Sequence, residues 1–200
     1  MDTTIKTDTI NITNKKYIQE TIDLFGEKVS GSAPSPSPIT LFNVDHNNAK
    51  TLPEKKRQIF HSCTAKLPYI SKRARPDIAT TISFLCTRVT KANKSDWNKL
   101  LHILKYPQNT ITMALILSAT SLTIFKTWAD ASYAPHDDMR SHTGGCSSLG
   151  IGVFMSKSIK QKLNSKSSTE AELIGASDIL PFILWSNHKI PFKSEYFLPG

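Results

Sequence analysis

The sequence predicts an α+β chain in which a helical first half precedes a second half that runs strand, strand, strand, helix. Two observations carry this prediction. Up to about residue 110, apolar residues recur at intervals of three and four, which is the period of a helix. From Ile111 onward, β-branched and aromatic residues form short runs separated by polar turns, and helical spacing returns only after Ser168. A chain of 200 residues can bury one large core or two modest ones.

The first helix is predicted over residues 15–25, where three apolar side chains share one face and Gly26 follows the last turn. Residues 30–41, SGSAPSPSPITL, contain three alternating prolines. Because proline fixes φ and lacks a backbone donor, neither a helix nor a sheet is expected there. Residues 31–52 are therefore predicted to be an extended, exposed linker.

Three further helices are predicted in the first half. One begins near Pro53, which is tolerated in the first turn because its missing N–H would have no helical partner there. Pro68 is expected to kink or break this helix, at a cost of about 3 kcal/mol. The next helix begins at Pro76, and the last runs from Ser95 and must end before Pro107. Residues 53–110 thus form a basic helical segment.

The second half contains four short runs typical of strands, which are TMALIL, LTIFKTWAD, GIGVFMSKS and KQKLNSKSS. Gly144 and Gly145 fit a turn between strands. Residues 168–187 return to helical spacing, although Pro181 lies among them. The residues predicted to face inward are Leu173, Ala176, Leu180 and Ile183. Residues 191–200 are predicted to be an irregular tail.

The composition excludes several classes of protein. Hydrophobic residues make up 39% and charged residues 20%, as in soluble globular proteins. The longest apolar candidate, ITMALILSATSLTIF, is interrupted by Ser and Thr, so no membrane span is expected. The N-terminus lacks the apolar core of a secretory signal, which predicts a location inside the cell, in the cytoplasm or the nucleus. The three cysteines lie far apart, without the spacing of a zinc site or a disulfide framework.

The chain is basic, with 25 Lys and Arg against 16 Asp and Glu and a formal charge of +9. Twelve basic residues and only two acids, Asp77 and Asp96, lie between Lys55 and Lys105. This pattern is typical of a polyanion-binding surface, and equally of solvated lysine-rich helices.

Three basic residues are candidates to bind the phosphates of a nucleic acid, namely Lys72, Arg73 and Arg75. The alternative is that they are cations placed favourably near the negative C-terminal end of a helix.

Asp130 ends an apolar strand, and Glu172 lies in the first turns of the final helix. If the two carboxylates converge, they offer the oxygen ligands that magnesium prefers. Two such ions about 3.5 to 4 Å apart can activate a water and stabilise the leaving oxygen in phosphodiester cleavage. The alternative is that Asp130 merely terminates a strand and Glu172 lies on a solvated helix face. Spacing alone does not decide between them.

The segments WADASYA, DDMRSHTGG and SKSIKQKLNSKSSTEAELIGAS occur in this order. They resemble the ribonuclease H domain of copia-type retrotransposon polyproteins. KKYIQETIDLFG and AKLPYISKRARPDIATTISFLCTRV resemble the end of the reverse transcriptase and its thumb and connection helices, so the resemblance spans roughly residues 10–188. It implies a reverse transcriptase end over 1–30, a thumb and connection segment over 53–110, and a truncated ribonuclease H-like domain over 111–190.

The resemblance also implies that Asp130 and Glu172 are the first two metal-binding, catalytic carboxylates, with magnesium as cofactor and an RNA–DNA hybrid as partner. A third aspartate of the family, on a strand after the helix, has no counterpart in HKIPFKSEYFLPG. Asp178 and Glu170 are turned away from Glu172 by helical geometry. Asp137 and Asp138 lie in a loop and fit solvated turn residues. The paired polymerase aspartates of the family are also missing.

Three hypotheses follow from the sequence. The chain is an inactive remnant of such a polyprotein, or a nuclease completed by a separate chain that supplies the missing carboxylates, or a noncatalytic basic nucleic-acid-binding protein. Absence of later strands is also expected to leave a sheet edge exposed and prone to aggregation.

Overall fold

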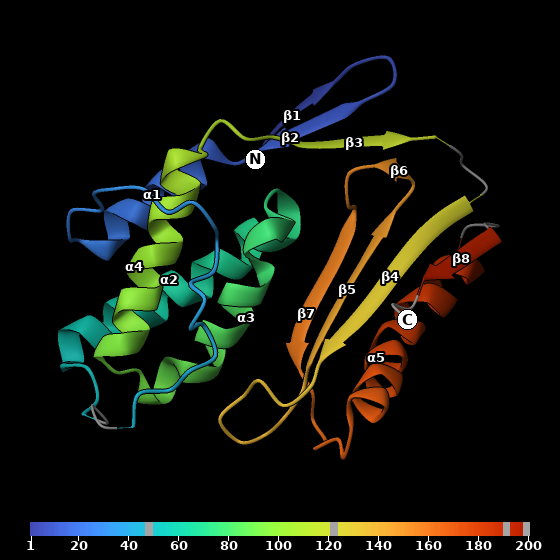
Figure 1. Cartoon of the computed structure of the whole chain (residues 1–200). Helices are drawn as coiled ribbons and strands as arrows, with labels where there is room; N and C mark the ends of the chain where they lie inside the picture. Colours follow the sequence, from blue (N-terminus) through green and yellow to red (C-terminus); the bar gives the residue numbers. More distant parts are fainter. Residues whose placement is uncertain (47–49, 121–123, 190–192, 198–200) are drawn as a thin grey trace. The chain divides into compact units, whose positions relative to one another are not determined.

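The computed structural model describes residues 1–46, 50–120, 124–189 and 193–197 (Figure 1). The chain forms two compact units. The first consists of Met1–Asp2 and Ile12–Ala114, and the second of Thr3–Asn11 and Leu115–Gly200. No helix in the described part of the chain is both long and apolar enough to cross a membrane.

The first unit is helical, as the sequence predicts. Its elements are α1 (Lys15–Phe25), α2 (Glu54–Arg73), η1 (Pro76–Ile78), α3 (Ala79–Arg88), η2 (Val89–Lys91) and α4 (Lys94–Asn109). Helix α1 has the predicted bounds and ends at Gly26, whose φ of 71° is the left-handed conformation that suits glycine. Apolar side chains from all four α-helices form one core, in which Phe25, Phe60, Leu85 and Leu100 are fully buried.

The internal prolines do not end their helices, so the prediction that α4 stops before Pro107 was wrong and, of the kink or break expected at Pro68, the break does not occur. Helix α2 continues through Pro68 to Arg73, and α4 continues through Pro107 to Asn109. A proline at 68 leaves the carbonyl of Thr64 without its helical N–H partner. The thiol of Cys86 takes that place, with Sγ 3.6 Å from the Thr64 oxygen. A tertiary contact therefore offsets part of the local cost of Pro68.

The linker between α1 and α2 is irregular, as predicted, but parts of it are buried. Leu41 and Ala33 are 3% and 6% exposed. Thr81 Oγ1 donates a hydrogen bond to the Pro36 carbonyl at 2.9 Å, which attaches the linker to α3. The prediction of a wholly exposed connector was wrong because the linker covers part of the helical core.

Two sheets lie mainly in the second unit, although Asp2, Ile12 and Thr13 of the first sheet belong to the first unit. One has the order β1-β2-β3-β6, from strands Asp2–Ile5, Ile10–Thr13, Leu115–Ala119 and Gly150–Ile151. The other has the order β7-β5-β4-β8, from strands Met155–Lys160, His142–Ser148, Ile124–Ser132 and Lys193–Phe197. Strand β4 pairs antiparallel with β5 and parallel with β8. Helix α5 (Ser168–Lys189) packs on β4 and β5 (Figure 1).

Several strands differ from the prediction, among them β1 and β2, which the sequence analysis did not predict. Gly144 and Gly145 lie within β5 and not in a turn. The predicted strand over KQKLNSKSS is absent, since β7 ends at Lys160. Strand β8 lies in the predicted irregular tail and covers β4 from Ile124 to Trp128. The unit is therefore β-β-β-α-β with respect to the second sheet, and the expected missing fourth strand beside β4 is present.

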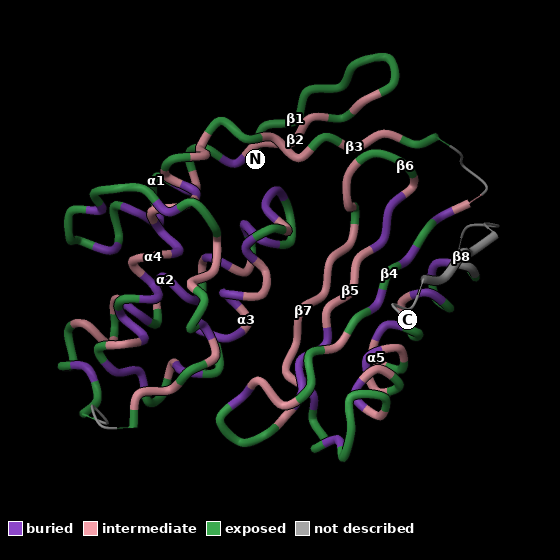
Figure 2. The backbone as a smooth tube through the Cα atoms, viewed as in Figure 1, coloured by how far each residue is buried: buried purple, intermediate pink, exposed green. Residues whose placement is uncertain are grey.

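The inward face of α5 is only partly the predicted one: Ile183 is buried as predicted, whereas Leu173 and Leu180 are not. Ala171, Gly175, Ile179 and Ile183 face the sheet, whereas Leu173 is 66% and Leu180 46% exposed. Figure 2 shows buried, intermediate and exposed residues alternating along the helix. The helix lies so close to the sheet that small residues are needed on its inward face. A Cβ added at Gly175 would lie 3.2 Å from the Cβ of Ala131. Leucines in that stripe would hold the helix off the sheet.

Candidate metal centre

Asp130 lies near the carboxyl end of β4, beyond the positions that pair with the described residues of β8. Strand β5 pairs with β4 as far as Ser132, whereas the described part of β8 pairs with it only as far as Trp128. Between Ala129 and Ser132, the backbone groups on the β8 side of β4 therefore have no ladder partner among the residues that the structure describes. This end of β4 can accept side chains from other elements.

Glu172 fills this position. Its Oε1 accepts a hydrogen bond from the backbone N–H of Ala131 at 3.3 Å. The contact requires α5 to lie close to β4, and Gly175, one turn later, permits that approach. The predicted pair of carboxylates is therefore brought together, with Glu172 bonded to the residue that follows Asp130.

The start of α5 explains why Glu172, and not Glu170, reaches the site. Ser167 caps the helix: its Oγ accepts from the Glu170 N–H at 3.2 Å, and its carbonyl accepts from the Ala171 N–H at 3.0 Å. Glu170 Oε2 accepts from the Lys166 N–H at 2.6 Å. Glu170 thus stabilises the helix terminus, and two residues later Glu172 points toward β4.

The electrostatics of the pair favour a bound cation. Burial raises the pKa of Glu172 the most, the N–H of Ala131 lowers it, and the neighbouring Asp130 raises it further. A carboxylate whose pKa is raised in part by a second carboxylate beside it also attracts a divalent cation, because the ion removes the same repulsion.

Other acids of the second unit have different partners. Asp178 Oδ2 accepts from Thr143 Oγ1 at 2.8 Å. Asp138 pairs with Lys160 at 2.6 Å, and Lys160 holds the pKa of Asp138 below its usual range despite partial burial. Within the described residues, no group of three or more His, Cys, Asp or Glu is arranged to hold a metal ion.

Strand β8 contributes one acid, Glu195, in register with Lys126. That register lies four residues before Asp130, which is about 13 Å along a strand. The sequence analysis predicted an irregular tail here and therefore missed the strand.

Two histidines lie close to the candidate site in sequence and form a buried pair of their own. His136 Nε2 and His142 Nδ1 are 2.9 Å apart, and His142 Nε2 lies 2.7 Å from Ser158 Oγ. Burial lowers the pKa of both imidazoles to about 4, and the charge of Lys160 contributes at His136. The pair is neutral at physiological pH. Its contact joins the loop that follows β4 to the start of β5.

The three predicted phosphate-binding residues separate into two kinds. Lys72 and Arg73 are exposed at the end of α2. Arg75 is 1% exposed, and its guanidinium donates to the Asp77 carboxylate at 2.8 Å and to Thr110 Oγ1 at 2.8 Å. Arg75 therefore joins η1 to the end of α4, and this geometry does not leave its guanidinium available to a phosphate.

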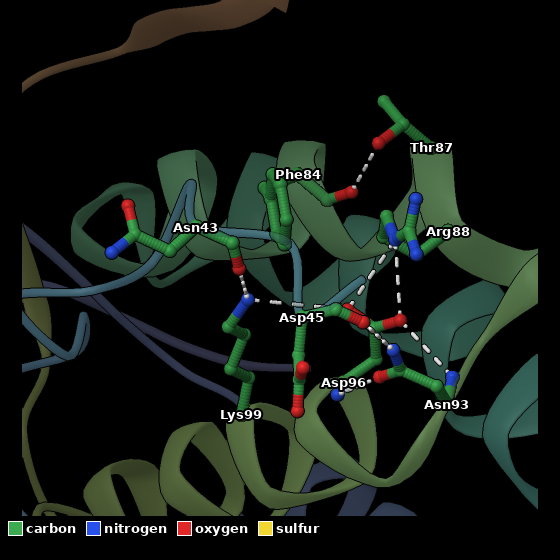
Figure 3. Close-up of polar contacts among 8 residues, drawn as sticks. All are labelled: Asn43, Asp45, Phe84, Thr87, Arg88, Asn93, Asp96 and Lys99. Carbon is green, nitrogen blue, oxygen red and sulfur yellow. Dashed lines mark hydrogen bonds and ion pairs between the residues drawn. The ribbon is translucent and has the colours of Figure 1, made fainter. Parts of the chain in front are cut away.

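A second buried cluster surrounds Asp96 (Figure 3). Its carboxylate accepts from Arg88 Nε at 3.2 Å and from the Asn93 N–H at 3.1 Å, and the Asn93 side chain caps α4 in return. Lys99 lies 4.0 Å from Asp96 and donates to the Asn43 carbonyl. Burial lowers the pKa of Lys99. Part of the basic stretch is thus internal and stabilises the fold.

The sequence reasoning missed the groups that allow Glu172 to reach β4. These are the N–H of Ala131 and the glycines at 145 and 175. A Cβ at Gly145 would overlap Ile179 Cδ1, whereas at Gly144 the nearest atom would be 3.9 Å away. Two adjacent glycines in a strand indicate a close backbone approach, and this signal was interpreted as a turn.

Comparisons with known proteins give distant relatives. An uncharacterized mitochondrial protein of Arabidopsis thaliana is 24% identical over 177 residues, 88% of this chain and 72% of the relative. The Retrovirus-related Pol polyprotein from transposon TNT 1-94 of Nicotiana tabacum is 26% identical over 87% of this chain, which spans only 13% of that polyprotein. The Secreted RxLR effector protein 161 of Plasmopara viticola is 26% identical over 62% of this chain.

No protein-family model matches the sequence, and no solved structure shows significant similarity to it. The mitochondrial protein and the tobacco polyprotein support derivation from a retrotransposon polyprotein.

Proposed function

We propose that this chain is a remnant of a copia-type retrotransposon polyprotein and that its second unit is ribonuclease H-like. In this proposal Asp130 and Glu172 form an incomplete divalent-cation site, and the chain does not hydrolyse the RNA of a hybrid unaided. The observation that carries the proposal is the convergence of these two carboxylates at the end of β4.

The topology supports the proposal. Helix α5 follows an antiparallel three-stranded meander and leads into β8, which is parallel to β4. In sheets with a strand–helix–parallel strand connection, ligands bind beside the carboxyl ends of the strands. Asp130 lies at that end of β4, and Glu172 reaches it from α5.

The chemistry explains the expected inactivity. A pair of divalent cations, most commonly magnesium, would supply the activated water and the stabilisation of the leaving oxygen. Asp130 and Glu172 would provide the shared oxygen ligands of the first ion. No third carboxylate joins them among the described residues. Those residues therefore supply no further ligand for a second ion.

Incubation of the purified chain with an RNA–DNA hybrid and either Mg²⁺ or Mn²⁺ tests this proposal. No cleavage above a protein-free control is expected. Cleavage by the wild-type chain that Asp130→Asn abolishes would contradict the proposed inactivity. Cleavage that survives Asp130→Asn would indicate a contaminating nuclease, which repurification of the same variant would remove.

A noncatalytic nucleic-acid-binding function is the second candidate, and the surface of the first unit favours it. Exposed cations there include Lys55, Lys72, Arg73, Lys91 and Lys94. If they bind phosphates, affinity for duplex DNA must fall steeply with salt, with a slope of about 0.9 per neutralised phosphate in a double-logarithmic plot. A flat salt response would exclude this function.

A further inference from the structure

Helix α5 has apolar side chains on two opposite faces. On its inner face, Ile179 and Ile183 are buried in the core that they share with the sheet. A helix turns by about 100° per residue, so Leu173, Leu180 and Leu184 lie within about 40° of one another on the other side. A helix that covers a sheet with one face normally presents polar residues on the opposite face. The outer face of α5 departs from this pattern.

This outer face is exposed over three turns. Leu173 is 66%, Leu180 46% and Leu184 58% exposed. With Ser177 they form a stripe about 17 Å long, which we call the outer stripe, with successive steps of four, three and four residues. Trp185 flanks the stripe and is 59% exposed. Steps of three and four residues are those of the contact positions of paired helices.

The charged groups of this face lie at its two ends. Glu170 precedes the outer stripe and His188 follows it, on the same side of the helix because 18 residues make about five full turns. Glu170 Oε2 accepts from the Lys166 N–H, which leaves its Oε1 without a partner among the described residues. His188 is exposed. No Lys or Arg occurs from Ser167 to His188, although the chain as a whole is basic.

The outer stripe is complementary to itself when two helices run antiparallel. Its steps of four, three and four residues are the same in both directions. A two-fold axis at the middle of the stripe therefore sets Leu173 against Leu184 of a second copy and Ser177 against its Leu180. A two-fold interface requires this kind of self-complementarity. The macrodipoles of the two helices are then also antiparallel, which is favourable.

We propose that the chain forms a two-fold dimer through the outer stripe, with the two α5 helices antiparallel. The same axis brings Glu170 of each copy beside His188 of the other, whose imidazole can donate to the free carboxylate oxygen. The charges at the ends of the stripe thus match, and the rest of the stripe is uncharged. The inference does not depend on the proposed function, because Glu172 contacts β4 on the sheet side of the helix.

A nucleic acid and a lipid surface are the competing occupants. The outer stripe has no cation beside it to neutralise phosphates. Helices that lie in a membrane surface carry Lys or Arg along their apolar stripe, and α5 has neither from Ser168 to His188. A second copy requires only the apolar contacts and the two end pairs. Because the stripe is short, association in about the micromolar range is expected.

Sedimentation velocity of the full chain, from about 1 to 100 μM, tests the dimer. A shift from monomer to dimer with rising concentration is expected. Leu180→Glu should raise the dimer Kd by about tenfold or more, because each dimer loses two leucine contacts and gains two carboxylates close to the axis. Circular dichroism shows whether the variant folds. Leu184→Glu should raise the Kd in the same way and keeps the test decisive if Leu180→Glu does not fold.

Leu163→Glu is the matched control. Leu163 is 66% exposed between β7 and α5 and lies outside the outer stripe, so the same new charge there should leave the Kd unchanged.

Disulfide cross-linking tests the antiparallel register. A mixture of Leu173→Cys and Leu184→Cys chains should form a covalent heterodimer, whereas neither variant alone should cross-link through the new cysteine. Like positions lie about 17 Å apart along the helix in this register, which is too far for a disulfide. The wild-type chain, whose Cys86 is exposed, measures the background.

A chain that stays monomeric at 100 μM would overturn the inference, as would a dimer whose Kd is unchanged by Leu180→Glu. Cross-links between like positions would contradict the antiparallel arrangement. Flotation with phosphatidylcholine vesicles tests the lipid alternative. A monomeric chain that floats with the vesicles, and that Leu180→Glu releases from them, would identify a lipid surface as the occupant and overturn the dimer.

Discussion

At the scale of single residues, the site depends on one hydrogen bond and one repulsion. The Ala131 N–H holds Glu172 in place, while Asp130 makes the ionised form of Glu172 less favourable. Such an arrangement favours ligand binding over stability, because the unliganded carboxylates repel each other.

Glu172→Gln should therefore stabilise the unliganded chain at neutral pH. The folded-state pKa of Glu172 is raised, so the glutamate contributes most favourably when protonated, and that contribution is lost as pH rises through its pKa. Above this pKa the free energy of unfolding of the variant should exceed that of wild type. The difference should stay below about 1 kcal/mol, since solvent screens the two carboxylates. Urea unfolding at pH 4 and pH 7 measures it.

Glu20→Gln, at a surface ion pair of the first unit, serves as a control that should show no such gain. A Glu172→Gln variant that is less stable than wild type at pH 7 would contradict the inferred repulsion.

The histidine pair predicts loss of stability in acid. Both folded pKa values are about 4, whereas the ordinary pKa of a histidine is 6.5, so the unfolded chain takes up protons first as pH falls. Stability is complete above pH 6.5 and decreases toward pH 4, by on the order of 3 kcal/mol for each histidine. Lys160, Asp138 and Ser158 surround the pair, and the Lys160–Asp138 ion pair persists in this range.

Hydrogen exchange of the β5 amides at pH 7 and pH 4.5 checks this prediction. His142→Gln should flatten the dependence, whereas the exposed His188→Gln should not. Unchanged protection of wild-type β5 at pH 4.5 would contradict it.

At the scale of elements, the approach of α5 to the sheet depends on glycine. Gly145→Ala should destabilise the second unit by about 1–3 kcal/mol, because its Cβ would overlap Ile179 and cores resist overpacking. Gly144→Ala is the matched control on the opposite face, where the nearest atom is 3.9 Å away. Thermal unfolding measures both.

Ile179→Val, which removes the overlapping Cδ1, should recover part of the loss in a Gly145→Ala background. Equal effects of the two glycine substitutions would show that α5 does not pack on β5 as described.

Proline in α2 gives a second prediction at this scale. Pro68→Ala should stabilise the first unit by about 1–3 kcal/mol, because the restored N–H can bond to the Thr64 carbonyl. That carbonyl now accepts from Cys86. Pro53→Ala, before the first turn of the same helix, should change stability much less. Urea unfolding of the two variants measures the change in the free energy of unfolding. A Pro68→Ala variant that is less stable than wild type would contradict the inferred local cost of this proline.

The individual helices and strands show how much of the fold can be predicted from the sequence. Periodicity predicted α1 residue by residue and placed strand β4, although this strand continues two residues past Asp130 to Ser132. It could not predict that α2 survives Pro68, because the compensating thiol lies on another helix. Strand β5 was missed because its glycines have little intrinsic strand propensity and are required by a contact with α5. The inward face of α5 was predicted only in part for the same reason.

At the scale of the whole molecule, the basic composition has two origins. Arg75, Arg88 and Lys99 are buried and bonded within the first unit. Other cations of the same stretch, among them Lys72 and Arg73, are exposed. Net charge alone therefore overstates the surface that a polyanion can contact, and the nucleic-acid interactions proposed for this chain depend on particular faces.

The relatives set the larger context. The tobacco polyprotein is far longer than the region that this chain matches. The proposal of an incomplete site concerns two carboxylates in this chain, and a separate segment that supplies further acidic ligands would complete it without changing Asp130 or Glu172.

The most direct test of the central claim is a Mn²⁺ titration of the chain with ¹³C-labelled Asp and Glu carboxyl groups, followed by NMR. We predict selective paramagnetic broadening of Asp130 and Glu172, and its loss at Glu172 in Asp130→Asn. Broadening that spares both residues, or that affects Asp138 and Asp178 equally, would contradict a cation site at the end of β4.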